Sequence, residues 1–280
     1  MILVTGGTGR VGSRLVRLLL EADEDVRVLC RDVERARASF GERVELAQGD
    51  LGDAQSERAA LDGVDRWFLL EPAGPQQLGQ ERRVIRGATH ADVRRVVKLS
   101  VLAADERSPV HLARWHRLAE QELAGSGLAH TILRPPFFMQ NFFAMAANGA
   151  IHTAAENGKV AMIDVRDVAA VAAVALTEDG HEAKTYTITG PQAVTFDEAA
   201  RQLSAATGRA TKHVRVPPEA VTRAMIEAGA PDWYARDMAA LHRLFAAGLE
   251  AVTTDDVTSV TGREPRRLDA FAKEEFAARA

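Results

Sequence analysis

The chain begins MILVTGGTGRVGSRLVRLLL, residues 1–20, and this stretch decides the fold. Residues 1–5 have the short apolar run of a buried strand, with Ile, Leu and Val in succession. Residues 6–12 are rich in glycine, and residues 13–20 carry the apolar spacing of an amphipathic helix. The sequence therefore predicts a strand, a tight turn and a helix that follow one another without a gap.

Four glycines occupy the turn, and their spacing indicates what it can bind. Gly7, Gly9 and Gly12 fit the pattern G-x-G-x-x-G, while Gly6, Gly9 and Gly12 fit G-x-x-G-x-x-G. Backbone N–H groups at a helix N-terminus bind phosphate well, provided that no side chain blocks the approach. Glycine is common, so the pattern alone is weak, and an ordinary tight turn is the alternative. Its position between a strand and a helix favours a dinucleotide site.

Strand-like and helix-like segments alternate along the first half of the chain. Apolar runs predict further strands at residues 26–30, 44–47, 66–70, 94–100 and 130–134, with helical segments between them. Regular alternation of this kind favours an α/β fold, a doubly wound parallel (Rossmann) sheet. The later, mostly helical part of the chain predicts a smaller C-terminal cap.

The pattern changes at residue 135, where two consecutive prolines end the last of these strands. We expect residues 1–135 to form the dinucleotide-binding domain and 159–190 to return to it. Residues 136–158 and 191–280 are expected to form a substrate-binding cap.

An apolar cluster rich in phenylalanine opens this cap. Phe137, Phe138 and Met139 are candidates for the wall of a substrate pocket, and Asn141 is the polar exception among them. The alternative is that these side chains form the core of a small second domain. Both interpretations are compatible with the sequence.

The segment TGGTGRVG (5–12) resembles the N-terminus of the atypical short-chain dehydrogenase/reductases, particularly the NmrA-like group. That group includes quinone reductases, azoreductase-like proteins and iminium reductases. Other segments agree with the resemblance: VRVLCRD (26–32), GDL (49–51), RRVVKLS (94–100), TILRPPFFMQNF (131–142), DVRDVAAVAAVAL (164–176) and YTITGP (186–191). The resemblance covers nearly the whole chain and implies an NAD(P)H-dependent oxidoreductase.

Arg31 bears on the choice of cofactor, because it stands at the end of the second predicted strand. An acidic residue usually contacts the ribose 2′-hydroxyl of NAD at this point, whereas an arginine suits a 2′-phosphate. Arg10 adds positive charge in the turn. Asp32 lies only one residue later, and a solvated surface arginine is the alternative for Arg31. The sequence favours NADPH over NADH.

Further cofactor contacts are expected where other predicted strands end, since ligands of open parallel sheets bind outside the carboxyl ends of the strands. In the resembled family an aspartate beside the adenine ring corresponds to Asp50, which could instead cap a helix. The loop that starts at Glu71 is expected to pass under the ribose and nicotinamide. The complete expected set is Gly6, Thr8, Gly9, Arg10, Val11, Gly12, Arg31, Asp50, Leu51, Leu70, Glu71, Ser100 and Pro136.

The residues that could supply a proton are less typical. The usual reductases of this superfamily use a Ser and a Tyr-x-x-x-Lys pair, but neither Tyr186 nor Tyr234 can lie on the helix predicted at 109–124. Alignment of that helix by its distance to the next strand puts His116 at the lysine position, and Ser100 matches the serine approximately. Both are catalytic candidates, with His116 orienting substrate or relaying a proton. An ordinary histidine on a helix face is the alternative.

Composition limits the remaining possibilities. With 46% hydrophobic and 26% charged residues, the 280-residue chain is typical of a globular protein, and the single cysteine, Cys30, favours a reducing compartment. A net charge of -4 argues against nucleic-acid or membrane binding. No charged leader precedes the first strand, so we expect no signal peptide and a cytoplasmic protein. No metal-binding motif is present in the sequence.

The sequence thus predicts an NADPH-dependent enzyme, a monomer or homodimer, that acts on a small molecule. Hydride would go to an activated acceptor, a quinone, an enone or an iminium ion, without help from a tyrosine. The alternative is an NADP(H)-sensing regulator of the NmrA-like type that binds a protein partner.

Overall fold

The structure is a computed structural model, and it describes residues 1–279. The chain divides into two compact units. The first consists of residues 1–106, 115–134 and 165–187, and the second of residues 107–114, 135–164 and 188–280. Among the described residues, no helix combines the length and the apolar character needed to cross a membrane.

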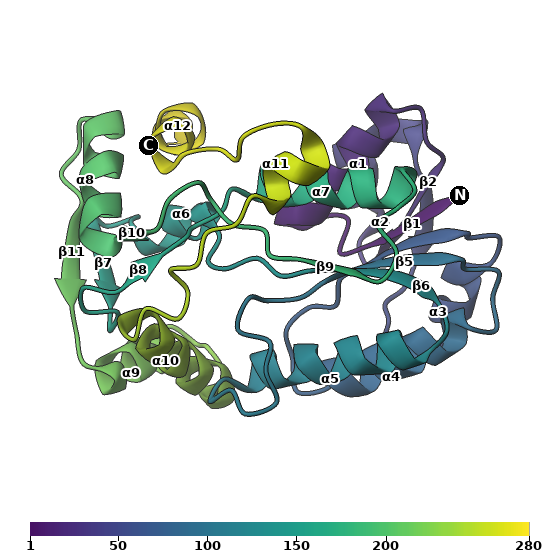
Figure 1. Cartoon of the computed structure of the whole chain (residues 1–280), viewed down its shortest axis with the longest axis horizontal. Helices are drawn as coiled ribbons and strands as arrows, with labels where there is room; N and C mark the ends of the chain where they lie inside the picture. The colour runs from purple at the N-terminus through teal and green to yellow at the C-terminus, as the bar shows by residue number, and fades with distance from the viewer. Residues whose placement is uncertain (280) are drawn as a thin grey trace. The chain divides into compact units, whose positions relative to one another are not determined.

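The first unit is built on a parallel sheet whose seven described strands have the order β3-β2-β1-β4-β5-β6-β9 (Figure 1). Its strands are β1 (Ile2–Thr5), β2 (Val26–Cys30), β3 (Glu45–Gln48), β4 (Arg66–Leu69), β5 (Arg95–Leu99), β6 (Ala129–Leu133) and β9 (Lys184–Tyr186). The chain moves outward from β1 to β3 and then crosses back to β4, on the other side of β1. This reversal confirms the doubly wound parallel fold and puts its switch point between β1 and β4.

Helices cover both faces of this sheet (Figure 1). On one face α1 (Arg10–Glu21) packs against α7 (Val165–Thr177). The other face carries α3 (Ala54–Leu61), α4 (Gln77–Ala88) and α5 (His111–Gly125), whose apolar residues share one core with Trp67, Leu69 and Val96 of the strands. Between β2 and β3 lie α2 (Val33–Phe40) and the short helix η1 (Gly41–Arg43).

The second unit combines short strands with helices. Its strands form two pairs, β10 with β8 antiparallel and β11 with β7 parallel. The elements are η2 (Met139–Asn141), α6 (Phe142–Met145), β7 (Ala150–Thr153), β8 (Lys159–Val160), β10 (Val194–Thr195), α8 (Phe196–Thr207), β11 (Lys212–Arg215), α9 (Pro218–Glu227), α10 (Asp232–Ala246), α11 (Asp256–Thr261), α12 (Leu268–Phe271), the π-helix η3 (Ala272–Phe276) and η4 (Ala277–Arg279). A capping box of Thr195 and Glu198 starts α8.

The first helix begins earlier than the apolar spacing predicts. It starts at Arg10 rather than at residue 13, so the last glycine of the turn belongs to its first turn. Helix α5 begins at His111 instead of residue 109. The sequence also predicts a strand at residues 185–189, and the corresponding β9 ends at Tyr186. Glycine and proline near these ends obscure the periodicity from which the boundaries were predicted.

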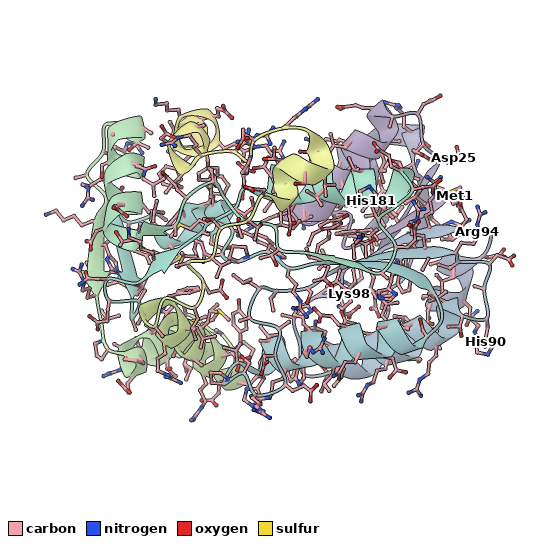
Figure 2. All side chains as sticks on the ribbon, viewed as in Figure 1. Met1, Asp25, His90, Arg94, Lys98 and His181 are labelled. Carbon is pink, nitrogen blue, oxygen red and sulfur yellow. The ribbon has the colours of Figure 1, made fainter. Side chains whose placement is uncertain are left out.

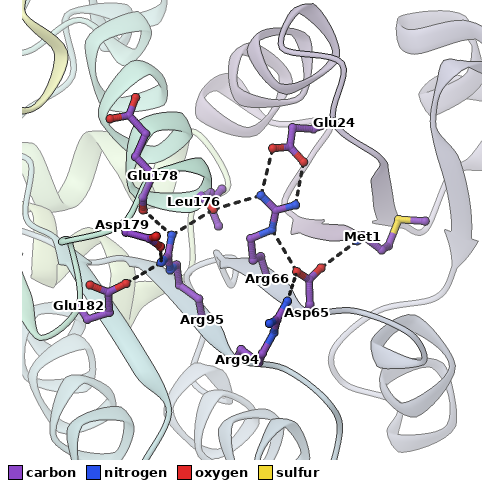
Figure 3. A network of polar contacts seen from close by, with 10 residues as sticks. All are labelled: Met1, Glu24, Asp65, Arg66, Arg94, Arg95, Leu176, Glu178, Asp179 and Glu182. Carbon is purple, nitrogen blue, oxygen red and sulfur yellow. Dashed lines mark hydrogen bonds and ion pairs between the residues drawn. The ribbon is translucent and has the colours of Figure 1, made fainter.

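Arginines at the amino edge of the sheet hold the end of α7 in place (Figure 3). The guanidinium of Arg66 donates to both carboxylate oxygens of Glu24, at 3.0 and 2.7 Å, and to the carbonyl oxygen of Leu176 at 3.4 Å. Arg95 donates to the same carbonyl at 3.5 Å and to Asp179 at 2.7 Å. A cation at a helix C-terminus is favourable because unpaired carbonyl groups point toward it.

Arg66→Met should therefore lower the free energy of unfolding by about 2 kcal/mol, since it leaves a partly buried carboxylate without its donors. Arg94→Met is the matched control. Arg94 belongs to the same network, but its side chain is 80% exposed and pairs with Asp65 at 3.1 Å. Its loss should cost less than about 1 kcal/mol. Urea unfolding of the two variants measures the difference, and equal losses would contradict the role given to Arg66.

Candidate functional site

The glycine turn brings the start of α1 directly onto the end of β1. Gly6 has a φ of +66°, a conformation that side chains disfavour, and its carbonyl oxygen accepts a hydrogen bond from the N–H of Gly9 at 2.9 Å. Gly12 lies on the same carbonyl, because a Cβ atom there would be 2.2 Å from its oxygen. A Cβ on Gly7 would be 2.6 Å from a methyl carbon of Val28. The turn is thus closed on its inner side.

Gly9 differs from the other glycines of the turn in that its Cβ position is less restricted by the protein. Its φ of −83° suits any residue, and a Cβ there would meet only the Gly6 carbonyl oxygen, at 3.1 Å. This contact is tight, but it is much less severe than the 2.2 Å approach at Gly12, so packing alone constrains Gly9 less than it constrains Gly12. The first N–H groups of α1 have no partner within the helix, so the open side of the turn suits a phosphate. The residues present fit a dinucleotide.

The end of β4 is tied to this turn. The hydroxyl of Thr5 donates to the carbonyl of Phe68 and accepts from the N–H of Leu70, both at 3.0 Å. The Leu70 side chain packs on Gly6, where a Cβ would be 2.8 Å from its Cδ2. The structure thus brings Leu70, and with it the following residue, Glu71, to the edge of the glycine turn.

Arg31 lies directly after β2, and its side chain is exposed. Asp32, which competes with it for a ribose in the sequence-based argument, has another role. Its carboxylate is the N-cap of α2 and accepts from the N–H of Arg35 at 2.9 Å. Arg10 is exposed in the first turn of α1, and Val11, which follows it, is buried.

Asp50 and Leu51 follow β3. The carboxylate of Asp50 accepts from the N–H of Gly52 at 2.6 Å, while Asp53 is the residue that caps α3. The sequence allows either Asp50 or Asp53 to cap this helix, and the structure uses Asp53. Leu51 is buried in the core under α3 and α4.

Ser100 is committed to a buried ion pair. It is 2% exposed, and its hydroxyl donates to Glu120 of α5 at 2.6 Å. The same carboxylate accepts from Nε of Arg134 at 2.9 Å and from Arg117 at 3.4 Å. The Ser100 proton therefore points at a carboxylate in this structure, which is a structural role for the hydroxyl.

His116 lies on α5, one turn before Glu120, and contacts α4. The Nε2 atom of Gln77 lies 3.4 Å from its Nε2 and 3.5 Å from its Nδ1. Burial, and after it the charge of Lys98, lowers the pKa of His116 well below its usual value. The imidazole is therefore neutral at physiological pH, so a proton relay that relies on an unperturbed histidine pKa does not fit this environment. His111, one turn earlier, instead bonds Asp237 of α10 at 2.7 Å.

A buried ion pair of Lys98 and Glu81 lies beside His116 and was not predicted from the sequence. Nζ of Lys98 lies 2.5 Å from a carboxylate oxygen of Glu81, and both side chains are fully buried. Lys98 is on the side of the sheet that faces α4 and α5 (Figure 2). The signal was available, because a lysine inside the apolar strand of RRVVKLS must be buried and paired if that strand is central.

Glu71 has an unusual environment as well. It is 9% exposed, and burial raises the pKa of its carboxyl to about 7. The charges of Glu81 and Asp50 raise this pKa further, whereas those of Lys98 and Arg83 lower it. A titratable carboxyl with a pKa near neutrality at the end of a central strand is typical of functional sites.

The expected pocket residues belong to the second unit. Met139 is buried in its core, and the ring of Phe137 packs on Phe142 and Phe196 at centroid distances of 5.4 and 5.6 Å. Phe138 and Asn141 are half-buried and Pro136 is buried. For Phe137 and Met139, then, the structure supplies a role as core residues. In the described part of the chain no group of three or more His, Cys, Asp or Glu side chains could hold a metal ion.

The doubly wound sheet and the glycine turn at its switch point define a dinucleotide-binding α/β protein. Comparison with known proteins gives the family, because the model of the NmrA-like family matches residues 1–275. The chain belongs to the NmrA-like family, as its motifs predicted.

Relatives resemble the chain over its whole length. It is 40% identical over 282 residues to an NAD(P)H azoreductase of Xenophilus azovorans, and the match covers 99% of each protein. The structure of an NADPH-dependent quinone oxidoreductase of Escherichia coli, complexed with NADPH, is similar with a TM-score of 0.88 at 28% identity and covers 99% of this chain and 100% of that one. A triphenylmethane reductase of Citrobacter complexed with NADP(H) gives a TM-score of 0.86 at 28% identity, with 98% and 99% covered.

The two glycines should respond differently to alanine. Gly9→Ala should fold with a smaller loss of stability than Gly12→Ala, since its Cβ would be 3.1 Å from the Gly6 carbonyl oxygen. It should weaken NADPH binding by at least about 1.4 kcal/mol, a factor of ten in Kd, because its methyl group lies where a phosphate is expected to approach. Gly12→Ala should destabilise the fold itself, because its Cβ would be 2.2 Å from a backbone oxygen. Gly79→Ala, which meets nothing within 4 Å, is the control. Calorimetric titration and thermal unfolding separate these effects. Normal NADPH affinity in a folded Gly9→Ala protein would leave the turn with a structural role only.

Proposed function

We propose that this chain is an NADPH-dependent oxidoreductase that transfers hydride to an activated small-molecule acceptor such as a quinone, an enone or an iminium ion. The single observation that carries the proposal is the glycine turn between β1 and α1, in which Gly9 is exposed and its Cβ position is less restricted by the protein than that of Gly12. The printed names of the relatives support the same class of reaction, since they include azo, quinone and dye reductases.

The preference for NADPH rests on residues at the end of β2. Arg31 is exposed there, and the carboxylate of Asp32 is held by the N-terminus of α2. The carboxylate of Asp32 is thus engaged as a helix cap, whereas the exposed guanidinium of Arg31 is available to a phosphate. A guanidinium recognises phosphate through charge-assisted and often bidentate hydrogen bonds.

The choice of acceptor follows from what α5 lacks. Its sequence, HLARWHRLAEQELAG, contains no tyrosine. The hydroxyl of Ser100 donates to a carboxylate, and His116 is neutral. A simple ketone needs a strong proton donor as its oxygen becomes an alkoxide, whereas a quinone or enone delocalises that charge and an iminium ion loses a positive charge. When NADPH is bound it supplies the hydride, and the protein contributes mainly positioning.

The first test is a comparison of acceptors. Quinones, enones and iminium ions should oxidise NADPH, and simple secondary ketones should react more slowly by a factor of about 10² to 10⁴, the usual contribution of a positioned acid. Steady-state rates across this panel, beside a cofactor titration, provide the measurement. Rapid reduction of a plain ketone would contradict the proposed chemistry. Tight NADPH binding without turnover of any acceptor would favour the regulatory alternative.

The second test concerns the cofactor. NADPH should bind about ten- to a hundredfold more tightly than NADH, because hydrogen bonds to a charged phosphate contribute about 1.5 to 3 kcal/mol. Arg31→Ala should remove most of that preference. Arg37→Ala is the control, since Arg37 is exposed on α2 and bonds Glu42. Equal affinities for the two cofactors in the unmodified protein would exclude the assignment of Arg31.

A further inference from the structure

Five polar side chains meet under the carboxyl edge of the sheet in the first unit. Gln77 and Glu81 lie one turn apart on α4, so they share one face of that helix. Glu81 pairs with Lys98 of β5, and Gln77 contacts His116 of α5. Glu71 follows β4, the strand beside β5. We call these five residues the inner polar cluster.

The cluster holds more acceptors than the protein satisfies. Buried oxygen atoms of Glu71 (Oε2), Gln77 (Oε1) and Glu81 (Oε2) have no hydrogen-bond partner among the described residues. Leaving a buried acceptor unpaired costs about 1 to 3 kcal/mol, and three together are unusual for a purely structural cluster. An unpaired carboxyl oxygen can be satisfied by protonation, when it becomes a donor, or by contact with a ligand or water.

The charges of the cluster affect whether the unpaired carboxyl group of Glu71 is protonated. Lys98 and Glu81 neutralise each other, so a charged Glu71 would be an extra buried anion near Glu81. Asp50, which follows β3, opposes ionisation of Glu71, and Arg83 of α4 favours it. The sum raises the pKa of Glu71 to about 7. Glu71 thus exchanges its proton in the physiological range.

The position of Glu71 in the fold connects its proton with the proposed reaction. Leu70, the residue before Glu71, packs on Gly6 of the glycine turn, and its N–H is bonded by Thr5. Glu71 therefore lies beside the point where the strand order reverses, where ligands of doubly wound sheets bind. Ser100, by contrast, donates to Glu120, and the neutral His116 is a weak acid.

We propose that Glu71 is the proton donor for acceptors that need a proton, that Glu81 is a positioning residue that favours its protonated form, and that Lys98 holds Glu81 in place. The proposal rests on the proposed function. A quinone takes one hydride, with its electron pair, from the bound cofactor and one proton from the Oε–H bond of Glu71, giving the hydroquinone and a carboxylate. A proton from water then restores the carboxyl group.

The experiment compares two acceptors that differ in their need for a proton. A benzoquinone requires hydride and a proton, whereas a cationic triarylmethane dye requires hydride alone to become neutral. Glu71→Gln should lower the ratio of the single-turnover quinone rate to the dye rate by about 10² or more, the lower end of the contribution of a positioned acid, because any effect on the cofactor is common to both acceptors. Glu71→Asp keeps the acid and should restore part of the quinone rate. Equal slowing of both acceptors, or of neither, would overturn the proposal.

The dependence on pH gives a second readout. Because the protonated form donates, the wild-type quinone rate should fall as pH rises through about 7, the raised pKa of Glu71. The Glu71→Gln rate should be flat over this range. Glu81→Gln removes a charge that raises this pKa, so the fall should move to lower pH. Glu250→Gln is the matched control, because burial also raises the pKa of Glu250 to about 7 but this residue lies in the second unit. A wild-type profile reproduced by Glu71→Gln would contradict the assignment.

An infrared measurement separates this inference from the proposed function. In the cofactor-free protein, the spectrum of the wild type minus that of Glu71→Gln should contain the carbonyl band of a protonated carboxyl at pH 6, and the band should disappear by about pH 8. Its absence would overturn the proposal whatever the enzyme reduces. If no acceptor oxidises NADPH, the proposed function fails, and a band with this titration would still establish Glu71 as the holder of the proton.

Discussion

The contact of Gly12 with the Gly6 carbonyl is the constraint on which the first unit depends. Because Gly12 has no side chain, α1 can begin at Arg10, directly beyond β1, and its first N–H groups face outward. Gly6 in turn lies against Leu70 at the end of β4. One approach of backbone to backbone therefore places the start of α1 at the end of β1, and the same turn lies against Leu70, the residue before Glu71. A methyl group at Gly12 would disturb the first contact directly.

Most of the sheet could be predicted from the sequence, because buried parallel strands are short apolar runs separated by helical periodicity. The run at residues 26–30 coincides with β2, and the other strands of the first unit differ by one to three residues at their ends. The start of α1 was missed since glycine is a poor helix former, and only the tertiary contact with Gly6 explains it. At this position the contact with Gly6 outweighs the low helix propensity of glycine.

The candidate site also combines residues that the sequence could predict with residues that only the fold brings together. The glycine turn was predictable because phosphate binding needs a local sequence pattern, and Arg31 because it follows β2 directly. The inner polar cluster was not, since its members come from β4, α4, β5 and α5 and only the fold unites them. Phe137 illustrates the reverse difficulty. An apolar run reads equally well as pocket or core, and its packing on Phe142 and Phe196 is visible only in three dimensions.

The composition of the cluster explains why one proton should be held there. Lys98 and Glu81 are fully buried, and such a pair persists only while both charges remain to compensate each other. Burial is the main reason that the pKa of Glu71 is raised and that of His116 lowered. The charge of Glu81 adds to the first shift and the charge of Lys98 adds to the second, although Lys98 also opposes the first. Of the two neutral groups, the carboxylic acid is the stronger proton donor, because it loses its proton near pH 7 while a neutral imidazole does not. An enzyme without a tyrosine on α5 can therefore still have an acid at the carboxyl edge of its sheet, supplied by the loop that follows β4 rather than by α5.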